Sequence, residues 1–229
     1  MSCLVRYDKE KREADKSMKI EIGKEKPTNF KEAWPGEFAL YSHFEYGAVV
    51  PSVLSLITTL KENGEYNACF YAGITFTGNK DNYHIILPGM GQSHTCANIL
   101  RDKVFCVNFI SSKYYKACIK TIEHNDEGDD EISAGGFTAM PCKTISVPRI
   151  EESIVSFECK LVSTHDITGN RKNMIYIGEV QLAHVEENSH LLERISGPDG
   201  FMYTINSAQN LRSEERMPHG AAYLTPFAV

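Results

Sequence analysis

Residues 91–110, GQSHTCANILRDKVFCVNFI, place the start of a short helix just before a buried strand, and this pair of elements decides the fold class. Ser93 or Thr95 can cap the helix, because a hydroxyl at its start accepts a hydrogen bond from a free N–H group of the first turn. The apolar positions of this helix are Ala97, Ile99, Leu100 and Val104. Residues 104–110, VFCVNFI, are too apolar and β-branched for a surface helix and predict a buried strand.

Strand patterns dominate on both sides of this stretch. Asn63-Gly64 and Thr168-Gly169-Asn170 supply turns between neighbouring strands, each typical of a hairpin. Because the strands do not alternate regularly with long helices, a doubly wound parallel sheet is disfavoured. The sequence predicts a mainly β fold, a β-barrel with a few helices. The predicted strands cover residues 48–60, 67–76, 82–90, 104–110, 144–150, 153–167 and 173–185.

Only short helices accompany these strands. Residues 111–124, SSKYYKACIKTIEH, predict a helix with a serine cap and apolar side chains at helical spacing. The acidic run from Glu123 to Glu131 lacks the ligand spacing of an EF-hand and is interpreted as a solvated loop. In the tail, His190–Ser196 is a candidate short helix and residues 201–205 are a candidate strand.

The length allows one large β domain or two small ones, and we favour the single domain. The chain has 229 residues, of which 42% are hydrophobic and 24% charged. A chain of this mass buries about 70% of its surface on folding, so it can form a core without disulfides. We expect a domain over residues 36–229 with an irregular C-terminal tail. Residues 1–35 are interpreted as a charged, solvated and partly mobile N-terminal arm.

Charge and cysteine usage narrow the partners and the compartment. The formal net charge of −6 argues against nucleic-acid binding, which needs clustered cations. No apolar run approaches the ~20 residues of a membrane span, and the N-terminus has no hydrophobic signal segment. Seven cysteines without a C-x-x-C pair indicate free thiols. We therefore expect a cytoplasmic protein that binds neither nucleic acid nor membrane.

No catalytic constellation is visible in the sequence. A nucleophile elbow, a Walker A loop and an HExxH pair are all absent, and His94-x-Cys96 alone is too little for a metal site, so we expect none. The start of the helix at Ser93, His94 and Thr95 could bind a phosphate, because helix N-termini expose N–H groups and a partial positive charge. Plain N-capping by Ser93 or Thr95 explains the same residues, so both interpretations stay open.

Several short segments, in this order, resemble the flavin reductase-like, FMN-binding split-barrel family, which includes the flavoredoxins. The resemblance runs from about Ala48 to about Glu186. The chain departs from the family pattern at Ala72, where a hydroxyl is usual, and lacks an Asp-Pro-Pro before its third strand. The matching segments are SLITT (55–59), Asn67-Ala68, HTCANI (94–99), FCVNF (105–109), Ala134-Gly135-Gly136-Phe137, VPRIEES (147–153), Glu158-Cys159 and IGEV (177–180).

The resemblance implies a six-stranded Greek-key split barrel that works as a homodimer, with FMN near the subunit interface. It places Thr95 at the FMN phosphate with Asn98 beside it, and makes Ser93 and His94 neighbours of that phosphate. It also places Thr58 and Thr59 near the ring or ribityl chain, and sets the backbone amides of Asn67, Ala68 and Cys69 against the ring edge. Without the resemblance, Thr58 and Thr59 are simply strand formers and Asn67 ends a turn.

Three functions follow as hypotheses. The first is an FMN-dependent oxidoreductase that takes electrons from NADH or NADPH and passes them to free flavin or another acceptor. In it FMN carries the chemistry, and no side chain is assigned as catalytic. The second is a flavoredoxin-type electron carrier without its own nicotinamide site, which exchanges electrons with a partner protein. The third is a non-enzymatic module that uses the barrel for another ligand.

Overall fold

The computed structural model describes residues 21–25, 44, 50–187, 190, 194–205 and 220–226. The chain divides into two compact units. The first comprises residues 1–49 and 207–218 and is described only at residues 21–25 and 44, so most of the predicted N-terminal arm lies outside the described residues. The second comprises residues 50–206 and 219–229 and contains every strand named below.

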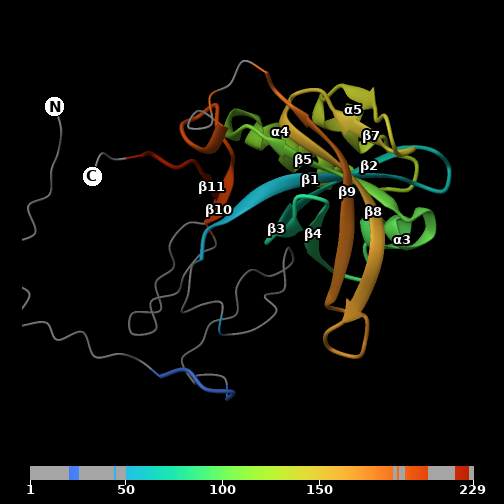
Figure 1. Cartoon of the computed structure of the whole chain (residues 1–229), viewed down its shortest axis with the longest axis vertical. Helices are drawn as coiled ribbons and strands as arrows, with labels where there is room; N and C mark the ends of the chain where they lie inside the picture. The colour runs from blue at the N-terminus through green and yellow to red at the C-terminus, as the bar shows by residue number, and fades with distance from the viewer. Residues whose placement is uncertain are drawn as a thin grey trace, which may run out of the picture. The chain divides into compact units, whose positions relative to one another are not determined.

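One antiparallel sheet of nine strands forms the body of the second unit (Figure 1). Its order is β11-β10-β1-β5-β8-β9-β4-β3, and β2 pairs with β1 along the edge that β5 does not use. The prediction of a mainly β fold is confirmed. The described residues form nine strands in this sheet, more than the six strands that the family resemblance implied. The strands are β1 (Ser52–Leu60), β2 (Tyr66–Ala72), β3 (Thr75–Asn79), β4 (Asn82–Gly89), β5 (Val104–Ile110), β8 (Ser153–Asp166), β9 (Met174–Val185), β10 (Tyr203–Ile205) and β11 (Gly220–Ala222).

The predicted strand over 67–76 is two strands in the structure. β2 ends at Ala72 and β3 begins at Thr75. Gly73 between them has a φ of 79°, a backbone conformation that glycine adopts without steric cost. The chain turns a corner there, so β3 pairs with β4 rather than continuing along β1.

The short helix and strand at 91–110 form as predicted. α3 (His94–Asp102) is capped by Ser93, whose side chain accepts from the Cys96 N–H, so the alternative cap at Thr95 is wrong. The helix ends at Lys103, which has a left-handed backbone with a φ of 61°. Val104, predicted as an apolar position of the helix, is therefore the first residue of β5.

Downstream of β5 the helices differ from the prediction. α4 (Tyr115–Glu123) is preceded by a 3₁₀ turn, η1 (Ser112–Tyr114), and neither has a side-chain cap, so the predicted serine cap is wrong. A further short helix, α5 (Glu131–Gly135), begins where the acidic run ends. The strand predicted at 144–150 is reduced to β7 (Pro148–Ile150), which pairs with β6 (Ala139–Pro141) in a separate two-stranded sheet.

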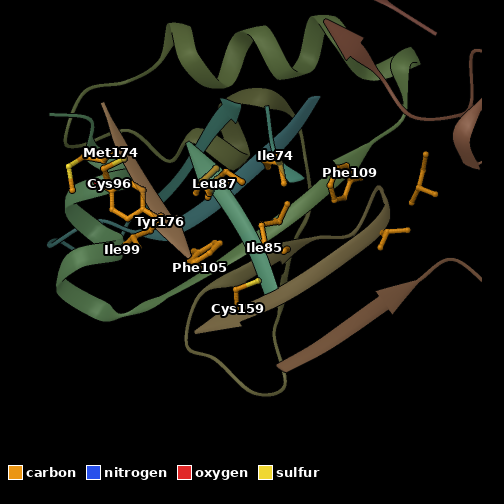
Figure 2. Packing of buried hydrophobic residues seen from close by; sticks show 14 residues of the cluster. Ile74, Ile85, Leu87, Cys96, Ile99, Phe105, Phe109, Cys159, Met174 and Tyr176 are labelled. Carbon is orange, nitrogen blue, oxygen red and sulfur yellow. The ribbon is translucent and has the colours of Figure 1, made fainter. Parts of the chain in front are cut away.

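Two hydrophobic clusters lie on opposite faces of β1, because successive side chains of a strand point to opposite faces. The first contains Ile57 and lies between the strands and α3. Figure 2 shows its α3 end, where Cys96 and Ile99 lie beside Tyr176. The second contains Leu56 and includes side chains from α4 and α5. Among the described residues, no helix is long and apolar enough to cross a membrane.

Candidate functional site

Seven of the nine predicted site residues lie together, where α3 packs on β1 and β2. Thr59 of β1 pairs with Asn67 of β2, so their side chains share one face of the sheet. Asn67 Nδ2 donates to Thr95 Oγ1 at 2.9 Å, and Asn98 Nδ2 donates to Thr59 Oγ1 at 3.0 Å. All four side chains are buried. These two hydrogen bonds fix the first turns of α3 against the strands.

Cys69 and Ser93 complete this group on the side of β2. Tyr71 Oη lies 3.2 Å from Ser93 Oγ and 3.6 Å from Cys96 Sγ. Burial raises the pKa of the Cys69 thiol to about 12, and the hydrogen bond with Thr95 offsets only part of that rise. The thiol therefore stays protonated at neutral pH and does not serve as a nucleophile.

The N-terminus of α3 can accept an anion. Its first turn holds no acidic residue, and Ser93 satisfies only the N–H groups of Cys96 and Ala97. Within the described residues, the N–H groups of His94 and Thr95 have no acceptor, and the buried His94 Nδ1 has no partner. Free N–H groups, the helix dipole and an imidazole nitrogen together suit a phosphate. This end of α3 thus fits the phosphate of the flavin that the sequence implied.

Thr58 and Ala68 lie on the opposite face of the β1–β2 pair. Thr58 Oγ1 donates to the Pro148 carbonyl at 2.5 Å and accepts from Asn108 Nδ2 at 3.1 Å. The Ala68 N–H donates to Glu131 Oε2 at 2.7 Å. Strand alternation turns both side chains away from the group around α3. Their assignment to the flavin stays a prediction, and for Ala68 it requires that Glu131 release the amide.

Glu131, which accepts from the Ala68 N–H, belongs to a buried ion pair that the sequence did not indicate. Lys61 Nζ lies 3.1 Å from Glu131 Oε1, and both side chains are 1% exposed. Lys61 Nζ also donates to the carbonyls of Asp126 and Asp129, at 2.6 and 2.8 Å. Burial raises the pKa of Glu131, although the Ala68 N–H and the Lys61 ammonium oppose that rise. The prediction of a solvated loop is therefore wrong at Glu131, because a lysine distant in sequence draws the end of the acidic run inward.

Arg101 is a second residue of this site that the sequence did not indicate. Its Nη1 donates to Asn98 Oδ1 at 3.1 Å, and its Nη2 donates to the Leu60 carbonyl at 2.6 Å. The guanidinium is also paired with Asp102. The only sequence feature that could have indicated Arg101 is its position in the last turn of α3, where a cation interacts favourably with the helix dipole. Arg101 holds the far end of the helix on β1, while Thr95 holds its start on β2.

The arrangement offers hydrogen-bond donors rather than acid–base or metal chemistry. Among the residues described, no group of three or more His, Cys, Asp and Glu side chains could hold a metal ion. The polar side chains near α3 are mostly bonded to one another, which makes them a rigid frame.

Comparison with known proteins agrees with this geometry. The model of the flavin reductase like domain matches residues 47–195 of this chain. Nitrilotriacetate monooxygenase component B from Bacillus cereus has a TM-score of 0.66 at 17% identity, covering 87% of this chain and 98% of its own. The FMN-binding protein from Thermus thermophilus, solved with bound p-hydroxybenzaldehyde, has a TM-score of 0.62 at 17% identity, covering 87% of this chain and 100% of its own.

A third solved structure, flavoredoxin from Methanosarcina acetivorans, has a TM-score of 0.59 at 18% identity and covers 85% of this chain and 95% of its own. At these identities the likenesses show a shared fold. A protein from Shewanella frigidimarina with a split barrel domain has a TM-score of 0.62 at 18% identity and covers 82% of this chain and 89% of its own. With the domain match it confirms the split barrel.

Proposed function

Because this chain belongs to the flavin reductase-like domain family, we propose that it is an FMN-dependent oxidoreductase that takes electrons from NADH or NADPH and passes them to free flavin or another acceptor. The family membership and its neighbours among solved structures support a flavin-related oxidoreductase. The single observation that supports a phosphate-bearing flavin such as FMN is the α3 N-terminus, where free N–H groups meet the unpartnered Nδ1 of His94. When bound, the flavin supplies the capacity to accept and release a hydride.

In this proposal the chain's residues bind and orient. The N–H groups of His94 and Thr95, with the His94 imidazole, hold the phosphate. The Asn67–Thr95 and Asn98–Thr59 hydrogen bonds keep α3 at a fixed distance from β1 and β2. Burial raises the pKa of the Cys69 thiol, so this side chain adds no negative charge beside the proposed flavin. No side chain acts as a general acid or base, in keeping with the absence of a triad.

The phosphate contact is tested by comparing FMN with riboflavin, which lacks the phosphate. Purified protein stripped of flavin is titrated with each, and binding is followed by quenching of flavin fluorescence. We expect His94→Ala to lower FMN affinity about tenfold, the loss of one hydrogen bond to a charged group, and to leave riboflavin affinity unchanged. His124→Ala, an exposed histidine at the end of α4, is the matched control. A wild-type protein that retains no FMN after desalting would remove the proposal.

The electron donor is tested on the FMN-loaded protein. Under anaerobic conditions, NADH or NADPH should bleach the flavin absorption within seconds. A flavin that stays oxidised with both nucleotides but is reduced by ferredoxin would favour the electron carrier, a role in line with the likeness to flavoredoxin. Failure to bind flavin at all would favour the non-enzymatic module.

Two further parts of the proposal concern the setting of the enzyme. We infer a homodimer from the family resemblance, and light scattering on the FMN-loaded protein tests it. We also place the enzyme in the cytoplasm, supported by six free cysteines among the described residues.

A further inference from the structure

Three cysteines that are distant in the sequence lie near one another outside the proposed flavin site. Cys106 belongs to β5, Cys159 belongs to β8, and Cys142 directly follows β6. All three are free thiols. Cys106 and Cys159 are fully buried, whereas Cys142 is only half-buried. The group therefore combines one thiol that solvent reaches with two that it does not.

Glu158 places Cys142 beside Cys106. Cys106 of β5 pairs with Glu158 of β8, so their side chains share one face of the sheet with Cβ atoms about 4.5–5.5 Å apart. The Glu158 carboxylate accepts from the Lys143 N–H at 2.8 Å and from the Thr144 N–H at 2.6 Å. These bonds hold the residue before them, Cys142, on the same face, where its side chain interacts with the Cys106 thiol.

Cys159 points to the other face of the sheet. It pairs with Phe105, the residue before Cys106, and successive side chains of a strand alternate between faces. Figure 2 shows Cys159 within the first hydrophobic cluster, which also contains Phe105. The Cys159 thiol donates to the Phe157 carbonyl at 3.6 Å. Cys106 rather than Cys159 is therefore the thiol that faces Cys142.

The difference in exposure sets an order of reaction for the two facing thiols. Burial raises the pKa of the Cys106 thiol well above its ordinary value, and the neighbouring Cys142 and Glu158 raise it further. Cys106 is therefore closed to solvent and stays a neutral thiol. Because oxidation follows exposure, a soluble oxidant meets Cys142 first, with Cys106 next to it to resolve the product.

We propose that Cys142 and Cys106 form a disulfide when the protein meets hydrogen peroxide. The Cys142 sulfur attacks a peroxide oxygen, the O–O bond breaks, and the leaving hydroxide takes the Cys142 proton, which gives a sulfenic acid and water. The Cys106 sulfur then attacks the sulfenic sulfur, and the hydroxyl group leaves with the Cys106 proton as a second water. Two thiols are oxidised, and one peroxide is reduced to two waters.

This disulfide ties the segment between β6 and β7 to β5, beside Glu158. In a reducing compartment such a bond is transient and responds to oxidant. The inference does not rest on the flavin, so it stands or falls separately from the proposed function.

Peptide mapping of the full chain tests the proposal, because trypsin places the three cysteines on separate peptides. Cys106 lies on residues 104–113, Cys142 on 121–143 and Cys159 on 150–160. The reduced protein is treated with hydrogen peroxide, its remaining thiols are alkylated, and the digest is examined by mass spectrometry. We expect peptides 104–113 and 121–143 to be joined, and dithiothreitol to separate them. Failure to join them, or the joining of 121–143 to any other peptide, overturns the proposal.

Variants test the order of the two steps. In Cys106→Ala the joined peptides should disappear, and dimedone, a reagent for sulfenic acids, should label Cys142. In Cys142→Ala both the joined peptides and the dimedone label should be lost. Cys159→Ala is the matched control and should form the disulfide as the wild type does. Equal dimedone labelling of Cys106 in Cys142→Ala would contradict the order. Thermal unfolding shows whether each variant is folded, and the wild-type digest tests the disulfide without any variant.

Discussion

Asn108, the asparagine of the FCVNF segment, joins three strands through one amide. Its Nδ2 donates to the Leu56 carbonyl and to Thr58 Oγ1, both at 3.1 Å. Its Oδ1 accepts from the Ile150 N–H at 3.0 Å and from Ser156 Oγ at 2.9 Å. A residue that carried part of the family resemblance thus holds β1, β7 and β8 together.

We expect Asn108→Ala to lower the free energy of unfolding by about 2–4 kcal/mol, because it leaves several buried groups unsatisfied. Urea unfolding at neutral pH measures the change. Asn82→Ala, at an exposed position of β4, should shift the midpoint very little. A loss below about 1 kcal/mol for Asn108→Ala would show that water replaces the amide.

Glu158 makes stability depend on acid pH. Burial alone would raise its pKa, but hydrogen bonds from Thr144, His184 and the Lys143 amide outweigh that effect and lower the pKa to about 2. An unfolded glutamate titrates near 4.5, so the folded state gains about 3 kcal/mol from this group above pH 4.5. That gain is lost progressively as the pH falls from 4.5 to 2.

The measurement is urea unfolding of wild type and Glu158→Gln between pH 7 and pH 2. Other carboxylates titrate equally in both proteins, so the difference between the two curves reports Glu158. We expect the difference to be largest at neutral pH and to shrink below pH 4.5. Parallel curves over the whole range would contradict the lowered pKa.

At this scale the sequence predicts residue types better than residue partners. Local rules predict Ser93 as the N-cap of α3, and the structure confirms this. Thr58 and Thr59 are adjacent in one motif, yet the strand sends them to opposite faces, where different neighbours bind them. Those neighbours, Pro148 and Asn98, are distant in sequence, and no local pattern reveals them.

At the scale of elements, the long apolar strands were predictable and the short elements were not. β5 and β9 follow the predicted bounds within a residue, because their apolar runs are long. α5 begins at Glu131, the last residue of the acidic run, and its five residues are too few for a helical period to show. The Asp130 cap and the buried Lys61–Glu131 pair hold this helix, and Lys61 belongs to a segment about 70 residues earlier in the chain.

The Lys61–Glu131 pair provides the test of that interpretation. Lys61→Met should destabilise the protein by about 3–5 kcal/mol, because it leaves the Glu131 charge buried and unpaired. The double variant with Glu131→Gln should recover much of this loss, since glutamine keeps an acceptor for the Ala68 N–H. Urea unfolding measures both, with Lys116→Met on the exposed side of α4 as the control. Additive losses in the double variant would mean that the pair is not coupled.

At the scale of the whole molecule, the fold class was the most predictable property. The lack of long helices between strands disfavoured a doubly wound parallel sheet, and the ordered short motifs indicated the family. The division of the interior into two clusters on either face of β1 was not foreseen. This division depends on the corner at Gly73 and on where the segments after β5 pack on the sheet. Strand-pairing rules alone determine neither.

The central position of β1 also sets the timing of folding. β1 pairs with β2, which follows it closely, but Ser52 pairs with Thr204 of β10. Such distant pairings are typical of β proteins that fold in milliseconds to seconds once complete. On the ribosome the delay is longer, since synthesis at about 5–20 residues per second puts roughly 8–30 s between the two strands. Throughout that interval the start of β1 has an unpaired edge, which can pair with another nascent chain.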